Sequence, residues 1–179
     1  MKKLYFTPSF IKTIQNTLLL PFFCLLLSGG AYLNAQTQVG TDIDGEATND
    51  ESGWSVSLSS DGTRMAIGAH LNDGNGSNSG HVRVYSESGG TWTQVGADID
   101  GEVAGDQLGR SVSLSSDGTR MAIGATHNDD NGSNSGHVRV YSESGGNWTQ
   151  VGMDIDGEAA GDQSGYSVSL SSDGTRVAI

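Results

Sequence analysis

The sequence predicts an all-β fold made of stacked repeats, and three observations support this. Nearly the same fifteen residues occur at 55–69 and at 111–125, and they begin a third time near the C-terminus. Gly53, Gly109 and Gly165 are 56 residues apart, as are many of the residues around them. No window after residue 35 shows a helical period in its apolar residues. A fixed period of this length is typical of repeat architectures, in which each copy is one supersecondary unit.

Each copy of the repeated stretch is predicted to form a β-hairpin. In residues 111–125, apolar side chains alternate on both sides of the turn formers Asp117-Gly118. Alternation places one set on one face of the pleat, namely Val112, Leu114, Met121 and Ile123. The opposite face carries Ser111, Ser113, Ser115 and Arg120. Because one hairpin cannot bury its apolar face alone, we expect neighbouring copies to cover it.

Residues 1–35 have the features of a cleavable signal peptide. Three lysines precede an apolar run at 18–27, and small residues lead up to an expected cleavage after Ala35. A membrane anchor is the alternative, but Pro21 interrupts the run, which is shorter than the roughly 20 residues that span a bilayer. Cys24 follows large apolar residues, so lipid attachment is not expected. We therefore expect a secreted or cell-surface protein that does not insert into the membrane after signal removal.

The remaining residues, 36–179, are strongly acidic. They contain no Cys and no Lys, and six Arg against 21 Asp and Glu give a formal charge of −15. Nucleic acid is not an expected partner, because it needs a basic surface. Such a charge suits solubility or cation binding. Without disulfides, stability must come from packing between repeats.

Each full repeat is expected to contain four strands. In one complete copy they are residues 110–116, 119–125, 137–142 and 148–153. Asp117-Gly118 and Gly145-Gly146 are expected to form tight turns. The segments 127–136 and 154–165 are rich in Asn, Asp, Ser and Gly, so we expect longer loops there. Residues 36–40 match the last strand of the later copies, so the array begins in mid-repeat.

Four antiparallel strands in each 56-residue period match one blade of a β-propeller, whose known repeats have roughly 40 to 50 residues. A β-solenoid is the structural alternative, but its coils are usually shorter and lack paired tight turns. Residues 36–179 hold about two and a half repeats, which would make an incomplete ring, since propellers close with roughly 4 to 8 blades. The last residue, Ile179, falls inside a predicted strand. We therefore expect the chain to be part of a longer protein.

Three segments of the repeat carry a resemblance to a known family. They are Gly-x-Ser-Val-Ser-Leu-Ser-Ser-Asp-Gly at 109–118, Met-Ala-Ile-Gly-Ala at 121–125 and Gly-His-Val-Arg-Val-Tyr at 136–141. Together they resemble the FG-GAP repeat, which builds the β-propeller of integrin α-chains and of many secreted bacterial proteins. The resemblance implies a propeller with an extracellular, adhesion-type role. In that family the calcium loop lies between the first two strands, where this chain has only a tight Ser-Asp-Gly-Thr turn.

A different acidic segment of the repeat is the predicted calcium site. Carboxylates at alternate positions beside a glycine can wrap a hard cation such as Ca²⁺. The predicted ligands, in two copies of the repeat, are Asp98, Asp100, Glu102, Asp106, Asp154, Asp156, Glu158 and Asp162. The alternative is a solvated acidic loop in which only Ile99 is buried.

Histidines and aromatic residues recur in the repeat without a clear site. His81 and His137 each open a predicted strand, but neither has a Cys or another His at ligand spacing, so zinc is not expected. The aromatic residues Tyr85, Trp92, Tyr141 and Trp148 flank the Gly-Gly turns and are predicted to pack blade against blade, with a sugar-stacking surface as the alternative.

Two functions remain open. The first is a non-enzymatic, exported repeat module that binds a protein or a glycan. It is favoured because catalysis needs different groups around one reacting centre, whereas these repeats present the same groups each time. The second is the N-terminal part of a propeller enzyme, a lyase or glycosidase, whose catalytic residues lie in further blades.

Overall fold

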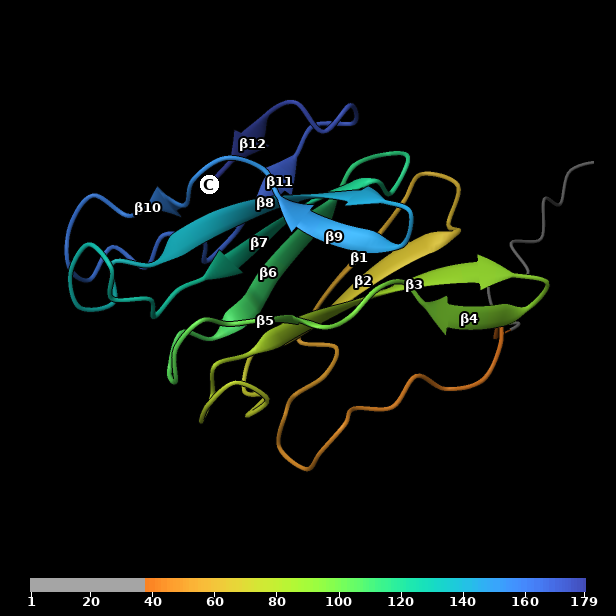
Figure 1. Cartoon of the computed structure of the whole chain (residues 1–179), viewed down its shortest axis with the longest axis horizontal. Coiled ribbons are helices and arrows are strands. Elements are labelled where there is room, and N and C mark those ends of the chain that lie inside the picture. Colours follow the sequence, from red (N-terminus) through yellow and green to blue (C-terminus); the bar gives the residue numbers. More distant parts are fainter. Residues whose placement is uncertain (1–37) are drawn as a thin grey trace, which may run out of the picture. The chain divides into compact units, whose positions relative to one another are not determined.

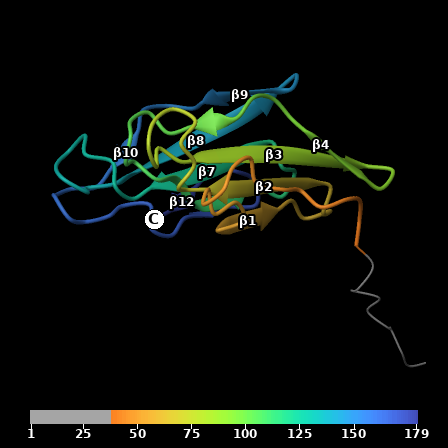
Figure 2. The ribbon, with the colours of Figure 1, turned by 90° about the horizontal axis from the view of Figure 1, so that it is seen from below.

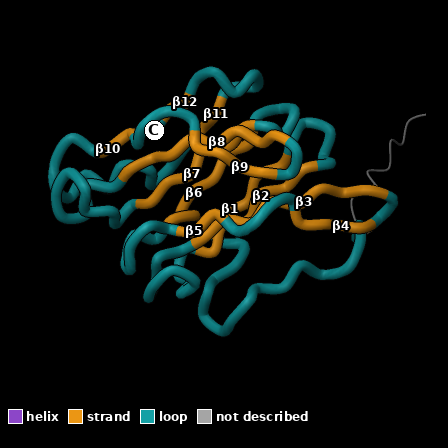
Figure 3. Tube along the Cα trace, viewed as in Figure 1, coloured by secondary structure: helices purple, strands orange, loops and turns teal. Residues whose placement is uncertain are grey.

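The computed structural model describes residues 38–179, which are strands joined by turns and loops (Figure 3). Residues 39–179 form one compact unit. Within the described range no helix is long and apolar enough to cross a membrane. The predicted signal peptide at 1–35 lies outside the described residues.

The first sheet is an antiparallel meander of four strands (Figure 1). A short fifth strand pairs with the third. The strands are β1 (Ser55–Leu58), β2 (Arg64–Ala69), β3 (His81–Ser88), β4 (Thr91–Gln94) and β5 (Ile99–Asp100). The β1–β2 turn contains Asp61 and Gly62, and Gly62 has a φ of 72°. A positive φ is cheap only for glycine, which explains the Asp-Gly pair in each copy of this turn.

The second sheet repeats the first in order and register. Its strands are β6 (Leu108–Leu114), β7 (Arg120–Ala125), β8 (His137–Ser144), β9 (Asn147–Gln150) and β10 (Ile155–Asp156). Strands β11 (Ser169–Leu170) and β12 (Val177–Ala178) form a further hairpin. Figure 2 shows the sheets from a perpendicular direction. Successive antiparallel sheets of this kind confirm the predicted all-β fold and correspond to propeller blades rather than to solenoid coils.

The fourth strand differs from the prediction. We expected one strand at 148–153 and a loop from residue 154, but the chain pairs with β8 in two separate pieces, β9 and β10. Gly152 between them has a φ of 80°, which interrupts the extended backbone. Ile155 and Asp156 then return to pair with Val138 and His137.

The apolar core lies where the alternation predicted it. Val112, Leu114, Met121 and Ile123 are all buried in the second sheet, in the same core cluster. In the first sheet, Val56 is 62% exposed and Leu58 is 57% exposed, although they occupy the same repeat positions as Val112 and Leu114. This difference shows that the apolar face of the second sheet is covered by the first sheet, whereas no described sheet precedes the first one to cover Val56 and Leu58.

The serine face of each sheet makes hydrogen bonds to the following sheet. Ser55 Oγ donates to the carbonyl of Gly109 at 2.7 Å, and Ser57 Oγ accepts from the amide of Leu114 at 2.9 Å. The same bonds recur one repeat later, where Ser111 and Ser113 contact Gly165 and Leu170. The small serine side chain therefore lets two backbones approach closely.

One of the repeated tryptophans also joins neighbouring sheets. Trp148 Nε1 donates to the carbonyl of Val95 in the first sheet at 3.2 Å, and its ring packs against the core. Trp92 Nε1 donates to the carbonyl of Val39 at 3.1 Å. The Trp148 contact agrees with the predicted packing of blade against blade, whereas Trp92 contacts residue 39, which lies outside the described strands.

Candidate functional site

Arg110, in the second repeat, lies at a β-bulge. The pairing of β6 with β7 shifts register between Leu108 and Ser111, and Gly109 in the bulge has a φ of 88°. Bulges that contain a glycine of positive φ re-aim the side chains beside them. Arg110 follows this glycine, as Trp54 follows Gly53 and Tyr166 follows Gly165. All three glycines have a positive φ.

Of the three side chains at this position, Arg110 contacts both of the others. The Arg110 guanidinium carbon is 4.4 Å from the centre of the Trp54 ring and 5.2 Å from that of Tyr166. Trp54 is 51% exposed and Tyr166 is 60% exposed. We call Trp54, Arg110, Tyr166 and the adjacent His70 the aromatic patch. A cation over exposed aromatic faces is a common element of recognition surfaces.

His70 fixes one side of the aromatic patch. Its ring is 4.6 Å from the Trp54 ring, and Arg110 Nη1 lies 3.1 Å from its Nε2 atom. Burial and the neighbouring Arg110 charge lower the pKa of His70, which opposes a second positive charge here. The neutral ring therefore accepts a hydrogen bond from Arg110, and this bond orients the guanidinium between the two aromatic rings.

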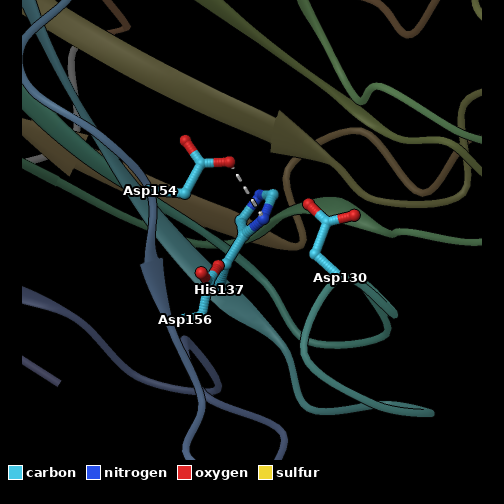
Figure 4. A group of neighbouring side chains, drawn as sticks. All are labelled: Asp130, His137, Asp154 and Asp156. Atoms are coloured by element: carbon cyan, nitrogen blue, oxygen red, sulfur yellow. Dashed lines mark ion pairs between the residues drawn. The ribbon is translucent and has the colours of Figure 1, made fainter.

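A second group of polar residues gathers around His137, the first residue of β8. Asp156 on β10 is its register partner, so both side chains project from the same face of the sheet. Asp154 precedes Asp156 by two residues, and Asp130 comes from the β7–β8 loop. One ligand atom from each residue can be chosen so that all four lie within 4.8 Å of one another (Figure 4). We call these four residues the His137 cluster.

Arg139 anchors one acidic member of the His137 cluster. Its Nε and Nη2 atoms donate to the two carboxylate oxygens of Asp154 at 2.9 and 2.6 Å. It also forms an ion pair with Glu102. Burial opposes ionisation of Asp154, but the hydrogen bonds from Arg139 and Gln150 outweigh it and lower the pKa of Asp154. The carboxylate is therefore charged and fixed in place.

His137 itself is almost completely buried, at 1% exposure. Its Nδ1 atom lies 3.6 Å from Asp154 Oδ2 (Figure 4), yet neither ring nitrogen makes a hydrogen bond. Burial and the nearby Arg139 charge lower the pKa of His137, which favours the neutral ring. Neutral imidazole is the form that coordinates a metal ion.

The first repeat contains a related but smaller group. His81 Nδ1 lies 3.7 Å from Glu46 Oε2 and 3.8 Å from Asp98 Oδ2. At the repeat position of Asp130 the first repeat has Gly74, and Asp100, the counterpart of Asp156, is not part of this group, which contains Glu46 instead. The two repeats therefore offer three and four potential ligands respectively.

The structure places the eight predicted calcium ligands in several different surroundings. Asp98, Asp154 and Asp156 join the histidine clusters, whereas Glu102 pairs with Arg139. Asp106 and Asp162 each accept a hydrogen bond from a backbone amide three residues earlier and so close a turn. Asp100 lies on β5 with its pKa raised by burial and by Asp98, and Glu158 is exposed. The predicted acidic loop does not fold around one centre.

Sequence reasoning missed the histidines and the aromatic patch. No potential metal ligand stands at a suitable spacing from either histidine in the sequence, because the carboxylates near it in the structure come from another strand and from a loop. The aromatic patch did leave a signal, since Trp54, Arg110 and Tyr166 differ within an otherwise nearly invariant motif. A varying position in a near-perfect repeat indicates a place where the repeats are not interchangeable.

Antiparallel sheets that recur at a constant period and bury one another's faces define a β-propeller-type repeat module. The family model for the FG-GAP repeat matches residues 36–85 and 95–141, which make up more than half of the chain. The chain therefore belongs to the FG-GAP repeat family. Repeats of this family are typically non-catalytic and often bind calcium. No curated protein matches the chain.

Proposed function

We propose that this protein is an exported, non-catalytic propeller module that binds a glycan or a protein through the aromatic patch. The observation that supports this most directly is the contact of Arg110 with two exposed aromatic rings, Trp54 and Tyr166. These residues come from three successive repeats. Only a stacked array places them together, so the patch depends on the repeat architecture.

The chemistry of the aromatic patch fits both classes of ligand. The apolar face of a sugar ring, or an aromatic side chain of a protein, can stack on Trp54 or Tyr166. Arg110 offers planar hydrogen-bond donors to a carboxylate or hydroxyl group of the same ligand. Tryptophan, tyrosine and arginine are also the residues that most often dominate binding energy at interfaces.

Export is the second part of the proposal and rests on residues 1–35. Lysines, an apolar run and small residues occur there in the order of a signal peptide. N-terminal sequencing of the protein recovered from outside the producing cell should find Gln36 as the first residue. Recovery of the intact chain inside the cell would contradict export.

Binding to a glycan array and to extracellular proteins tests the aromatic patch. We expect Trp54→Ala and Tyr166→Ala each to weaken binding by roughly 30-fold, since a central interface residue contributes about 2 kcal/mol. Trp92→Ala is the matched control, because it removes the same side chain at a structural contact. If circular dichroism shows that both patch variants are folded and their binding is unchanged, the aromatic patch is not the binding surface.

A further inference from the structure

We infer that the His137 cluster binds one Zn²⁺ ion through Asp130, His137, Asp154 and Asp156. The acidic residues alone would not justify this, because exposed carboxylates often gather without an ion. The distinguishing observation is His137, which is 1% exposed and faces the carboxylates with both ring nitrogens lacking a hydrogen-bond partner. A buried polar atom left unpaired costs free energy, which a metal–nitrogen bond would recover.

The set of donors favours Zn²⁺ over Ca²⁺. Calcium prefers six to eight oxygen ligands, and imidazole nitrogen is a poor ligand for it. Zinc accepts nitrogen and carboxylate oxygen together, usually from four ligands. One imidazole with three carboxylates is such a set. The total charge also favours a cation, because among the described residues Arg139 is the one arginine in ion pairs with the four carboxylates of Glu102 and the three aspartates, and it pairs with Glu102 and Asp154.

The geometry requires some ligand atoms to move closer by about 1 Å. The four candidate atoms lie within 4.8 Å of one another, whereas ligands about 2.0 to 2.2 Å from a shared tetrahedral zinc ion are about 3.3 to 3.6 Å apart. Asp130 and Asp156 are exposed and can rotate to close the gap. His137 and Asp154 are held in place by burial and by Arg139. Two of the proposed ligands are therefore fixed before the metal binds, and the other two can adjust to it.

Solvent reaches the cluster at its two exposed members, Asp130 and Asp156. Asp130 also lines a pocket of about 230 Å³ between the β7–β8 loop and residues 103–106, which the other three ligands do not line. The first repeat has Gly74 in place of Asp130, so we expect its three-residue group to bind zinc more weakly.

Isothermal titration of the purified full-length protein with ZnCl₂ and with CaCl₂ tests the inference. We expect one Zn²⁺ per chain, bound at least tenfold more tightly than Ca²⁺. Replacing a ligand by His137→Gln or Asp130→Gly should weaken zinc binding by about tenfold or more, since even outer-shell changes cost roughly 10- to 100-fold. Asp130→Gly introduces the residue that the first repeat has at the equivalent position, so this variant is expected to fold.

Two further variants sharpen the experiment. Asp129→Asn removes an equal charge beside the cluster but no ligand, and it should leave zinc affinity unchanged. Gly74→Asp gives the first repeat the missing carboxylate and should add a second zinc equivalent. The visible spectrum of bound Co²⁺ should also change in His137→Gln. Equal zinc affinity in the parent protein, Asp130→Gly and His137→Gln, or zinc and calcium affinities that are the same, would overturn the inference.

Discussion

At the scale of single residues, the aspartate of each Asp-Gly turn organises the hairpin around it. Asp61 Oδ1 accepts hydrogen bonds from Ser59 Oγ at 2.6 Å and from the amide of Thr63 at 3.0 Å. Asp117 and Asp173 make the same contacts in their own turns. Each bond favours the ionised carboxylate, with the serine bond having the largest effect.

These turn aspartates should titrate at unusually low pH. The hydrogen bonds lower the pKa of Asp61 and of Asp173 to about 2. Because the pKa is depressed in the folded state, the stabilisation exists above the unfolded value near 3.8 and is lost as pH falls towards 2. Carbon NMR of the carboxyl groups would measure both midpoints.

A single substitution tests the cause of this shift. Ser59→Ala removes the strongest hydrogen bond to Asp61, so we expect the pKa of Asp61 to rise. Asp173 keeps its own partner, Ser171, and should titrate as before. A pKa of Asp61 that does not respond to Ser59→Ala would contradict this explanation.

At the scale of strands and sheets, a glycine permits the close approach of neighbouring blades. A Cβ atom added to Gly68 on β2 would lie 2.2 Å from the carbonyl oxygen of Gly109. The same conflict recurs between Gly124 on β7 and Gly165, at 2.0 Å. Neither Gly68 nor Gly124 has a positive φ, so space rather than backbone conformation requires glycine there.

Gly68→Ala should therefore loosen the contact between the two sheets. We expect the free energy of unfolding to fall by about 1 to 3 kcal/mol, the usual cost of overpacking. Urea denaturation followed by tryptophan fluorescence would measure it. Gly45→Ala is the control, because Gly45 is exposed and its added Cβ would lie 3.2 Å from the Ser52 side chain and 3.9 Å from the Ala47 carbonyl oxygen. Equal free energies of unfolding for the two variants would contradict the idea that lack of space requires glycine at position 68.

At the scale of the whole molecule, charge opposes compactness. The chain carries a formal charge of −12, and residues 36–179 carry −15. Such self-repulsion weakens folding until salt screens it or cations bind. The acidic residues after β5 and β10 concentrate this charge near the junctions between sheets.

We expect calcium to raise the melting temperature more than sodium chloride of the same ionic strength does. Bound cations stabilise the folded state beyond simple screening. Thermal melts in matched solutions would separate the two effects, and His137→Gln would show how much depends on the His137 cluster. An identical shift with both salts would indicate screening alone and would contradict specific calcium binding by the acidic residues.

The sequence by itself determined the strands, the turns and the period of this protein. Alternation of Val112 and Leu114 fixes which side chains share a face, and Asp117-Gly118 fixes the turn between two strands. Both signals are local, because they depend on the geometry of a few consecutive residues. The break between β9 and β10 was missed because Gly152 sits in a segment whose pairing depends on β8.

Only the tertiary structure decided which side chains meet. Trp54, Arg110 and Tyr166 are 56 residues apart in sequence, and stacking of the sheets brings them into contact. His137 meets Asp154 through the pairing of β8 with β10. A repeat period predicts that equivalent residues exist in each copy, but the distances between their side chains depend on how closely the sheets pack. That packing depends on contacts between blades, and the partners lie about one repeat apart for the serines and 41 residues apart for Gly68 with Gly109.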